Sequence, residues 1–172
     1  DNSIAISNGG YIVATANSTI EYDDMNGNNL YYKDLEGANG FFADATLTSI
    51  CDANVIYDAG ADRFIMVTQT CQGNSSTSEV IMCFSKTNNP LNGWWVYRFS
   101  GNPLNDASWF DFPSIGVSTN ELYVSGNLIY DAGGFNQTCL FQMTKSVGYA
   151  GGTYNSTNSG VWYNVNDGNG NP

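Results

Sequence analysis

The chain has 172 residues, of which 42% are hydrophobic and 14% aromatic. This is enough for a single domain, residues 1–172, with a packed core, and it excludes a disordered chain. The formal net charge of −11 comes from 16 acidic and 5 basic residues, which excludes a basic surface for nucleic acid or anionic membranes. Since the sequence also lacks an apolar run long enough to span a bilayer, we expect no membrane insertion.

The N-terminal part of the chain predicts a meander of four short strands at residues 3–35. Asn8-Gly9-Gly10 and Asn26-Gly27 supply the positive φ angles that tight hairpin turns require. The expected strands are residues 3–7, 11–16, 19–23 and 29–35.

Two further units of the same kind are expected at residues 52–100 and 112–165. Each contains four apolar or aromatic runs that are separated by clusters of Gly, Asp, Asn, Ser or Pro. The expected strands are residues 54–57, 63–69, 80–85 and 94–99 in the second unit, and 112–117, 121–127, 138–144 and 160–165 in the third.

The spacing of these units predicts the fold class. The second strand of each unit starts near Tyr11, Phe64 and Leu122, about 55 residues apart, and a four-stranded repeat of this length is typical of a β-propeller blade. We therefore expect an all-β, propeller-like fold with about three four-stranded antiparallel blades. Because propellers usually close with about four to eight blades, either further blades or partner chains complete the ring, or the strands form an open sandwich.

Three segments resemble the repeats of secreted bacterial and archaeal β-propeller domains. Residues 54–64 are similar to the strand pair P-x-V-x-Y-D-x-x-x-x-R-W, residues 83–95 to the hairpin S-x-T-x-D-P-x-G-x-W, and residues 110–116 to the blade opening D-Y-P-x-x-G. The hairpin also resembles the Asp-box of sialidase-like propellers. The chain departs from these patterns at Ala53, where the family has Pro, and at Asn89, where it has Asp. The resemblance implies a secreted propeller domain.

The cysteines indicate an oxidising compartment. They lack the CxxC spacing of zinc or redox sites, so their even number predicts disulfides. Three pairings are possible. The expected register of the first hairpin in the second unit brings Cys51 near Cys71, which favours the Cys51–Cys71 bond together with Cys83–Cys139.

Four N-x-S/T sequons lie at predicted turns, where a glycan would not disturb a core. They begin at Asn17, Asn74, Asn136 and Asn155. Together with the cysteines, they predict an extracellular or cell-surface glycoprotein.

Histidine is absent, which removes the commonest general base, the commonest metal ligand and every Ser-His or Cys-His pair. Acid–base chemistry would then depend on carboxylates. Glu21, Glu79 and Glu121 lie on predicted strands, but no spacing identifies a catalytic pair. No catalytic residue is therefore assigned, and we expect a binding protein more than an enzyme.

A sialidase-type site would need a cluster of arginines, and the chain has only Arg63 and Arg98. Arg63 begins a predicted strand, where its expected role is structural, through a bond to a turn carbonyl or to Asp58.

Two loops with oxygen side chains at alternate positions are weak calcium candidates, although neither has the downstream Glu that completes an EF-hand. Their expected ligands are Asp24, Asn26 and Asn28 in one loop, and Asp167, Asn169 and Asn171 in the other. Calcium is the only cofactor that the sequence suggests.

The aromatic residues allow two roles. Trp94 and Trp95 are adjacent on one predicted strand, so they face opposite sides and are expected to pack between blades. Trp109, Tyr130 and Trp162 lie near loops, where they could stack on sugar rings.

Taken together, these features favour an extracellular binding or assembly module, such as an adhesin or a surface-filament component. Its expected partners are other protein chains or further blades, and carbohydrate. The alternative is a secreted glycan-active hydrolase that uses Asp and Glu carboxylates.

Overall fold

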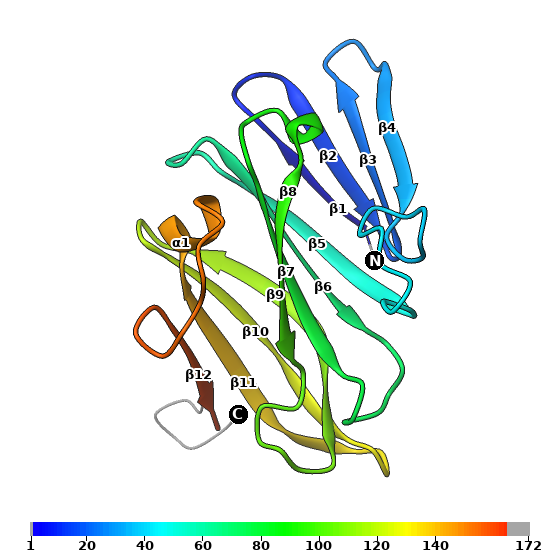
Figure 1. The fold of residues 1–172 in the computed structure, drawn as a ribbon, viewed down its shortest axis with the longest axis vertical. Helices are drawn as coiled ribbons and strands as arrows, with labels where there is room; N and C mark the ends of the chain where they lie inside the picture. Colours follow the sequence, from blue (N-terminus) through cyan, green and yellow to red (C-terminus); the bar gives the residue numbers. More distant parts are fainter. Residues whose placement is uncertain (1, 165–172) are drawn as a thin grey trace.

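The computed structural model describes residues 2–164, which form three four-stranded antiparallel sheets arranged side by side (Figure 1). In each sheet the strands follow one another in chain order, as expected for a propeller blade. Sheet 1 consists of β1 (Asn2–Ile6), β2 (Tyr11–Ala16), β3 (Thr19–Asp24) and β4 (Asn29–Asp34). The all-β, blade-like organisation that the sequence predicts is therefore confirmed.

Sheets 2 and 3 repeat this meander. Sheet 2 consists of β5 (Ile50–Asp58), β6 (Arg63–Thr70), β7 (Glu79–Ser85) and β8 (Trp94–Ser100). Sheet 3 consists of β9 (Ser108–Val117), β10 (Glu121–Tyr130), β11 (Phe135–Thr144) and β12 (Ser159–Tyr163).

The first strands of the three sheets lie next to one another. β5 contacts both β1 and β9, whereas β4, β8 and β12 form the outer edges of their sheets. The first strand of each unit therefore lines the axis of the ring and the fourth strand lies at its periphery.

Two cores hold the sheets together, one on each face of sheet 2. The first packs Val13, Ile20 and Tyr22 of sheet 1 against residues such as Phe64. The second packs residues of sheet 2 such as Ile65 against the inner face of sheet 3. Because sheet 2 is covered on both faces, β6 and β7 are buried along almost their whole length, while the other two sheets alternate between buried and exposed positions.

The outer faces of sheets 1 and 3 are not covered. Ile4, Ile6 and Tyr32 of sheet 1 are 64%, 50% and 57% exposed, and Trp162 of sheet 3 is 57% exposed. Large apolar side chains are therefore exposed on the outer faces of both sheets.

The two cores also overturn one predicted disulfide. Cys51 and Cys71 are bonded as expected, but Cys83 and Cys139 are free and fully buried. Cys83 points into the core between sheets 1 and 2, and Cys139 into the core between sheets 2 and 3. Their strands are equivalent in successive sheets, but the two thiols lie on opposite sides of sheet 2 and cannot meet.

Other differences are local. β5 begins at Ile50 and β9 at Ser108, several residues before the predicted starts, because a bulge interrupts the alternation of each strand. A 3₁₀ turn (Pro90–Asn92) and the short helix α1 (Lys145–Tyr149) were not predicted. Within residues 2–164, neither helical segment is long and apolar enough to cross a membrane.

Candidate functional site

The strands at the axis carry a repeated irregularity. β5 shifts register against β6 between Cys51 and Asn54, and β9 shifts against β10 opposite Gly126. In both bulges one non-glycine residue takes a left-handed conformation, Asp52 at φ 54° and Phe112 at φ 63°. Such backbone is costly for a bulky residue and is concentrated at functional sites.

The bulge in β9 has a clear steric cause. A Cβ atom on Gly126 would overlap the ring of Phe110 and approach the carbonyl oxygen of Asp111 to 2.8 Å. A residue without a side chain therefore allows β9 to come close to β10 and to turn Phe112 outward, where 64% of its surface is exposed.

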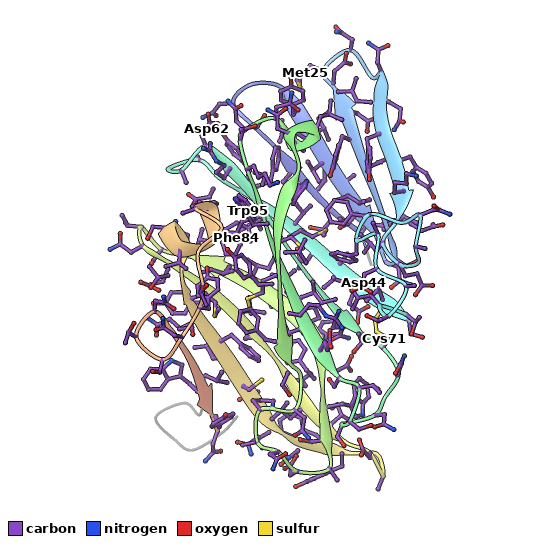
Figure 2. The ribbon with its side chains drawn as sticks, in the orientation of Figure 1. Met25, Asp44, Asp62, Cys71, Phe84 and Trp95 are labelled. Atoms are coloured by element: carbon purple, nitrogen blue, oxygen red, sulfur yellow. A yellow bond between two sulfur atoms is a disulfide. The ribbon has the colours of Figure 1, made fainter. Side chains whose placement is uncertain are left out.

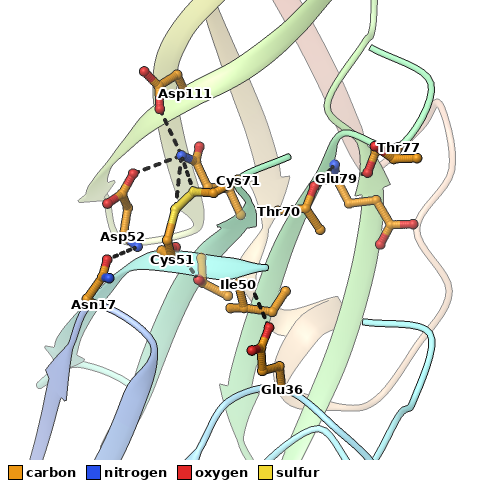
Figure 3. Close-up of a disulfide and its surroundings, with 12 residues drawn as sticks. Asn17, Glu36, Ile50, Cys51, Asp52, Thr70, Cys71, Thr77, Glu79 and Asp111 are labelled. Atoms are coloured by element: carbon orange, nitrogen blue, oxygen red, sulfur yellow. Dashed lines mark hydrogen bonds between the residues drawn. A yellow bond between two sulfur atoms is a disulfide. The ribbon is translucent and has the colours of Figure 1, made fainter. Parts of the chain in front are cut away.

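The bulges place two carboxylates around one buried amide, as Figure 3 shows. Gln69 Nε2 donates to Asp52 Oδ2 at 2.8 Å and to Asp111 Oδ1 at 2.9 Å. Gln69 on β6 has no exposed surface, and its Oε1 has no hydrogen-bond partner among the described residues. The amide nitrogen thus bridges the two carboxylates, which come from neighbouring blades.

The electrostatics of this pair are unusual for a surface carboxylate. Burial raises the pKa of Asp52 and the negative charge of Asp111 raises it further, while the positive charge of the N-terminus and the hydrogen bond from Gln69 partly offset both effects. Among the described residues, no lysine or arginine forms an ion pair with either carboxylate. A ligand that donates hydroxyl groups would therefore suit this pair of neighbouring carboxylates.

A cavity of about 240 Å³ opens beside Asp52, at the seam between sheets 1, 2 and 3. Ser3 Oγ donates to Asn54 Oδ1 at 2.9 Å and thereby joins β1 to β5 at its wall. The cavity is lined by Asn2, Ser3, Asp52, Ala53, Asn54, Phe112 and Pro113. Hydrogen-bonding groups and an exposed aromatic ring thus meet in one hollow at the axis, and we call this cavity together with Gln69 and Asp111 the axial site.

The disulfide lies against the same network. Gln69 Nε2 is 3.7 Å from Cys51 Sγ and 3.4 Å from Cys71 Sγ (Figure 3). Cys51, Asp52 and Cys71 come close enough together for three metal ligands. Metal binding to cysteine needs free thiolates, so the two bonded sulfurs do not serve as metal ligands. The disulfide instead links β5 to the segment that follows β6.

Asp24 of the first calcium candidate holds a hairpin turn together, and calcium binding at this loop stays a prediction. The carboxylate of Asp24 accepts hydrogen bonds from the backbone N–H groups of Asn26 and Asn28 and from both of their side-chain amides. The side chain of Asn28 is the main reason why the pKa of Asp24 lies below its usual value. Because nitrogens and not oxygens surround it, Asp24 acts as the acceptor of a capped hairpin turn. The second candidate, Asp167, Asn169 and Asn171, lies outside the described residues.

The sequons all lie in turns or at strand ends. Asn17, Asn74 and Asn155 are exposed and Asn136 is half-buried. Asn17 Oδ1 accepts from the backbone N–H of Asp52 at 3.3 Å, so this sequon abuts the axial site. Glycosylation remains a prediction at all four.

The other charged candidates are occupied elsewhere. Arg63 donates to the carbonyl of Asp62 at 2.9 Å, a turn contact as expected. Arg98 binds both carboxylate oxygens of Glu79, at 2.6 and 2.8 Å. Asp58, which the sequence offered as a partner of Arg63, is bonded instead to Lys145.

The predicted sugar-stacking aromatics are scattered. Trp162 and Tyr130 are 57% and 42% exposed, on the outermost and second strands of sheet 3, while Trp109 is half-buried against Gly73. Trp94 packs into the first core as expected, and Trp95 turns to the other face, where Lys86 lies over its ring. Figure 2 shows Trp95 near Phe84, the residue that pairs with it on β7.

Sequence reasoning missed the pairing of Asp52 with Asp111 and the exposure of Phe112. A signal was present, since residues 52–53 and 111–113 are the parts of the propeller-like repeat patterns that open a blade. Only the bulges and the adjacency of β5 and β9 reveal that both segments meet through Gln69.

No protein-family model and no curated protein matches the chain. A solved structure that is similar is a point mutant of the alpha-L-arabinanase of Cellvibrio cellulosa, with a TM-score of 0.53 and 13% sequence identity over 93% of this chain. The chain spans about half the length of that protein, 51%. The likeness supports a β-propeller-like fold, and at this identity it does not extend to activity.

Proposed function

We propose that the chain is an extracellular carbohydrate-binding module on a β-propeller scaffold, and that the axial site binds a sugar. The proposal depends on the observation that Asp52, Asn54 and the exposed Phe112 border one cavity at the axis. Carboxylate and amide groups bond sugar hydroxyls, while an aromatic face covers the apolar side of a sugar ring.

The charge of the site restricts the ligand class. Among the described residues, neither Asp52 nor Asp111 forms an ion pair with a lysine or arginine, and the whole chain carries a net charge of −11. A neutral glycan can donate hydroxyls to these carboxylates, whereas an acidic glycan would be repelled. Neutral polysaccharides are therefore the first ligands to test, and arabinan is included because the similar solved structure is an arabinanase.

The test is a comparison of three proteins on an array of neutral and acidic glycans, followed by calorimetry on each ligand found. Phe112→Ala is expected to weaken binding at least tenfold, since it removes the one aromatic residue among the described residues that line the cavity. Trp162→Ala is the matched control, because it removes an exposed aromatic side chain from an outermost strand and should bind like the wild type. Equal binding by all three proteins would exclude the axial site.

A second function has one specific observation in its favour. The acceptor oxygens of Asp52 and Asp111 both lie within 2.9 Å of one nitrogen, so they are less than about 6 Å apart. This limit includes the separation of about 5–5.5 Å that retaining glycosidases use. The raised pKa of Asp52 is also what a general acid requires.

Release of reducing sugar separates the two functions. A hydrolase should lose turnover by at least a hundredfold in both Asp52→Asn and Asp111→Asn. A binding module should release no sugar in any form, and it should retain measurable affinity when both residues are asparagine.

We also propose that further blades or partner chains cover the outer faces of sheets 1 and 3, as an assembly module or adhesin would require. The exposed apolar residues on both faces support this proposal. Light scattering after size-exclusion chromatography tests for self-association. A dimer that dissociates on Ile4→Lys supports partner chains, whereas a monomer supports further blades as the elements that cover these faces.

A further inference from the structure

The disulfide and the axial site share a single buried side chain. Gln69 Nε2 lies against both sulfurs of the Cys51–Cys71 bond and also donates to Asp52 and Asp111. Gln69 has no exposed surface and is tightly enclosed. A change in the separation of the two sulfurs must therefore move the amide that orients both carboxylates.

The backbone couples the same groups. Asp52 follows Cys51 directly and is held at positive φ, where its N–H donates to Asn17 and its side chain turns toward Gln69. Thr68 Oγ1 also bonds the carbonyl of Cys51, at 2.6 Å. A rearrangement at Cys51 is thus passed to the bulge that carries Asp52.

The other end of the bond is accessible. Cys71 is exposed and begins a loop whose Gly73 lies against Trp109 and whose Ser75 donates twice to Asp131, at 2.8 and 2.7 Å. The disulfide therefore fastens one end of a loop, here called the strap, that joins β6 to β7 and packs on sheet 3. An external thiol or disulfide can reach this end of the bond.

We propose that the Cys51–Cys71 bond is a redox switch for the axial site. The site binds its ligand when the bond is formed and releases the ligand when the bond is reduced. This inference rests on the proposed function. Two thiols cannot stay as close as two bonded sulfurs, so reduction separates β5 from the start of the strap and disturbs Gln69. The site would then be inactive in a reducing cytoplasm and would become competent after export to an oxidising compartment.

The chemistry is ordinary thiol–disulfide exchange with a low-molecular-weight disulfide such as oxidised glutathione. The exposed Cys71 thiolate attacks one glutathione sulfur, forms a mixed disulfide and expels one glutathione thiolate. The Cys51 thiolate then attacks Cys71 Sγ and expels the second. Two electrons pass from the protein to glutathione, and the two protons lost by the cysteines end on the two glutathione thiols.

The free cysteines do not interfere, because Cys83 and Cys139 have no exposed surface and lie in the two cores. In the folded protein, only the Cys51–Cys71 pair should therefore respond to a glutathione redox buffer. This makes the wild-type chain suitable for the experiment without background substitutions.

The test follows two readouts across a series of glutathione redox buffers. The first is affinity for the glycan identified on the array, which should fall at least tenfold on reduction, with the same midpoint as the disulfide measured by alkylation and mass spectrometry. The second needs no ligand: in a carboxyl NMR titration, Asp52 should shift toward the ordinary behaviour of an exposed aspartate on reduction. Asp24, which is held by its own turn, is the internal control and should not change.

The second readout separates failure of the switch from failure of the proposed function. If no glycan binds but Asp52 responds to reduction, the coupling stands and the ligand class is wrong. If Asp52 titrates identically in both redox states, the switch is overturned. The variant Cys51→Ala/Cys71→Ala should show the affinity and the Asp52 titration of the reduced protein in every buffer. If this variant does not fold, the reduced and oxidised forms of the wild type are compared directly.

Discussion

The buried ion pair between sheets 2 and 3 allows a quantitative test of what holds the blades together. Lys145 Nζ lies 2.6 Å from Asp58 Oδ2, and the two side chains are only 5% and 7% exposed. Tyr149 also donates to Asp58, at 2.8 Å. Replacement of Lys145 by Met would leave a buried carboxylate without a counter-ion, which typically costs about 3–5 kcal/mol of the free energy of unfolding.

For a chain of this length, that loss corresponds to a fall in Tm of about 6–20 °C. Chemical denaturation with two probes gives the free energy directly. Lys33→Met is the matched control, because Lys33 is exposed and its side chain donates to the carbonyl of Asn39 with no ion pair in the described part of the chain. It should change stability by less than about 0.5 kcal/mol. Asp58→Asn/Lys145→Met should recover part of the loss, since an amide carries no charge.

The pH dependence gives a second check on the same pair. Burial alone would raise the pKa of Asp58, but hydrogen bonds from Lys145 and Tyr149 and the charge of Lys145 outweigh it, and the pKa lies below its usual value. The pair therefore contributes stability above the ordinary aspartate pKa of about 4, and this contribution is lost as the pH falls through the depressed value. The difference in the free energy of unfolding between wild type and Lys145→Met should become smaller as the pH falls through that value. A loss below 1 kcal/mol at neutral pH, or a difference independent of pH, would refute this reasoning.

Two further predictions concern packing. Burial raises the pKa of the Cys139 thiol to about 12 and that of Cys83 above its usual value, so a thiol reagent should detect neither in the folded protein and both after denaturation; reaction under native conditions would contradict the two-core structure. Gly126→Ala should cost about 1–3 kcal/mol in urea denaturation, because its Cβ overlaps the ring of Phe110, whereas Gly116→Ala has open space and should be nearly neutral. Equal effects would show that the bulge does not depend on Gly126.

Most of the fold was predictable because its signals are local. Alternating apolar residues between Asn-Gly and Gly-Gly turns fix hairpins without any distant contact, and the observed strands of sheet 1 match the predicted ones closely. The predicted strand boundaries are wrong where the alternation of buried and exposed residues is interrupted. Asp52 and Phe112 each add a residue to an inner strand, and an interruption of this kind cannot be told from a strand end in the sequence alone.

The axial site was much less predictable, because its members are far apart in the chain. Gln69 and Asp111 are separated by 42 residues, and nothing in their spacing indicates that they meet. The disulfides show the same limit. Cys51 and Cys71 flank one hairpin, so local register was sufficient to pair them, whereas the fate of Cys83 and Cys139 depended on which face of its sheet each thiol occupies.

The sequence by itself determined an acidic, all-β chain built from three repeated meanders, since turn chemistry and alternation act within a few residues. Only the tertiary structure decided which faces are covered, which cysteines remain free, and that two carboxylates from neighbouring blades share one buried amide. Those outcomes depend on how the sheets stack, and stacking is set by the combined packing of side chains from all three units and not by any one segment.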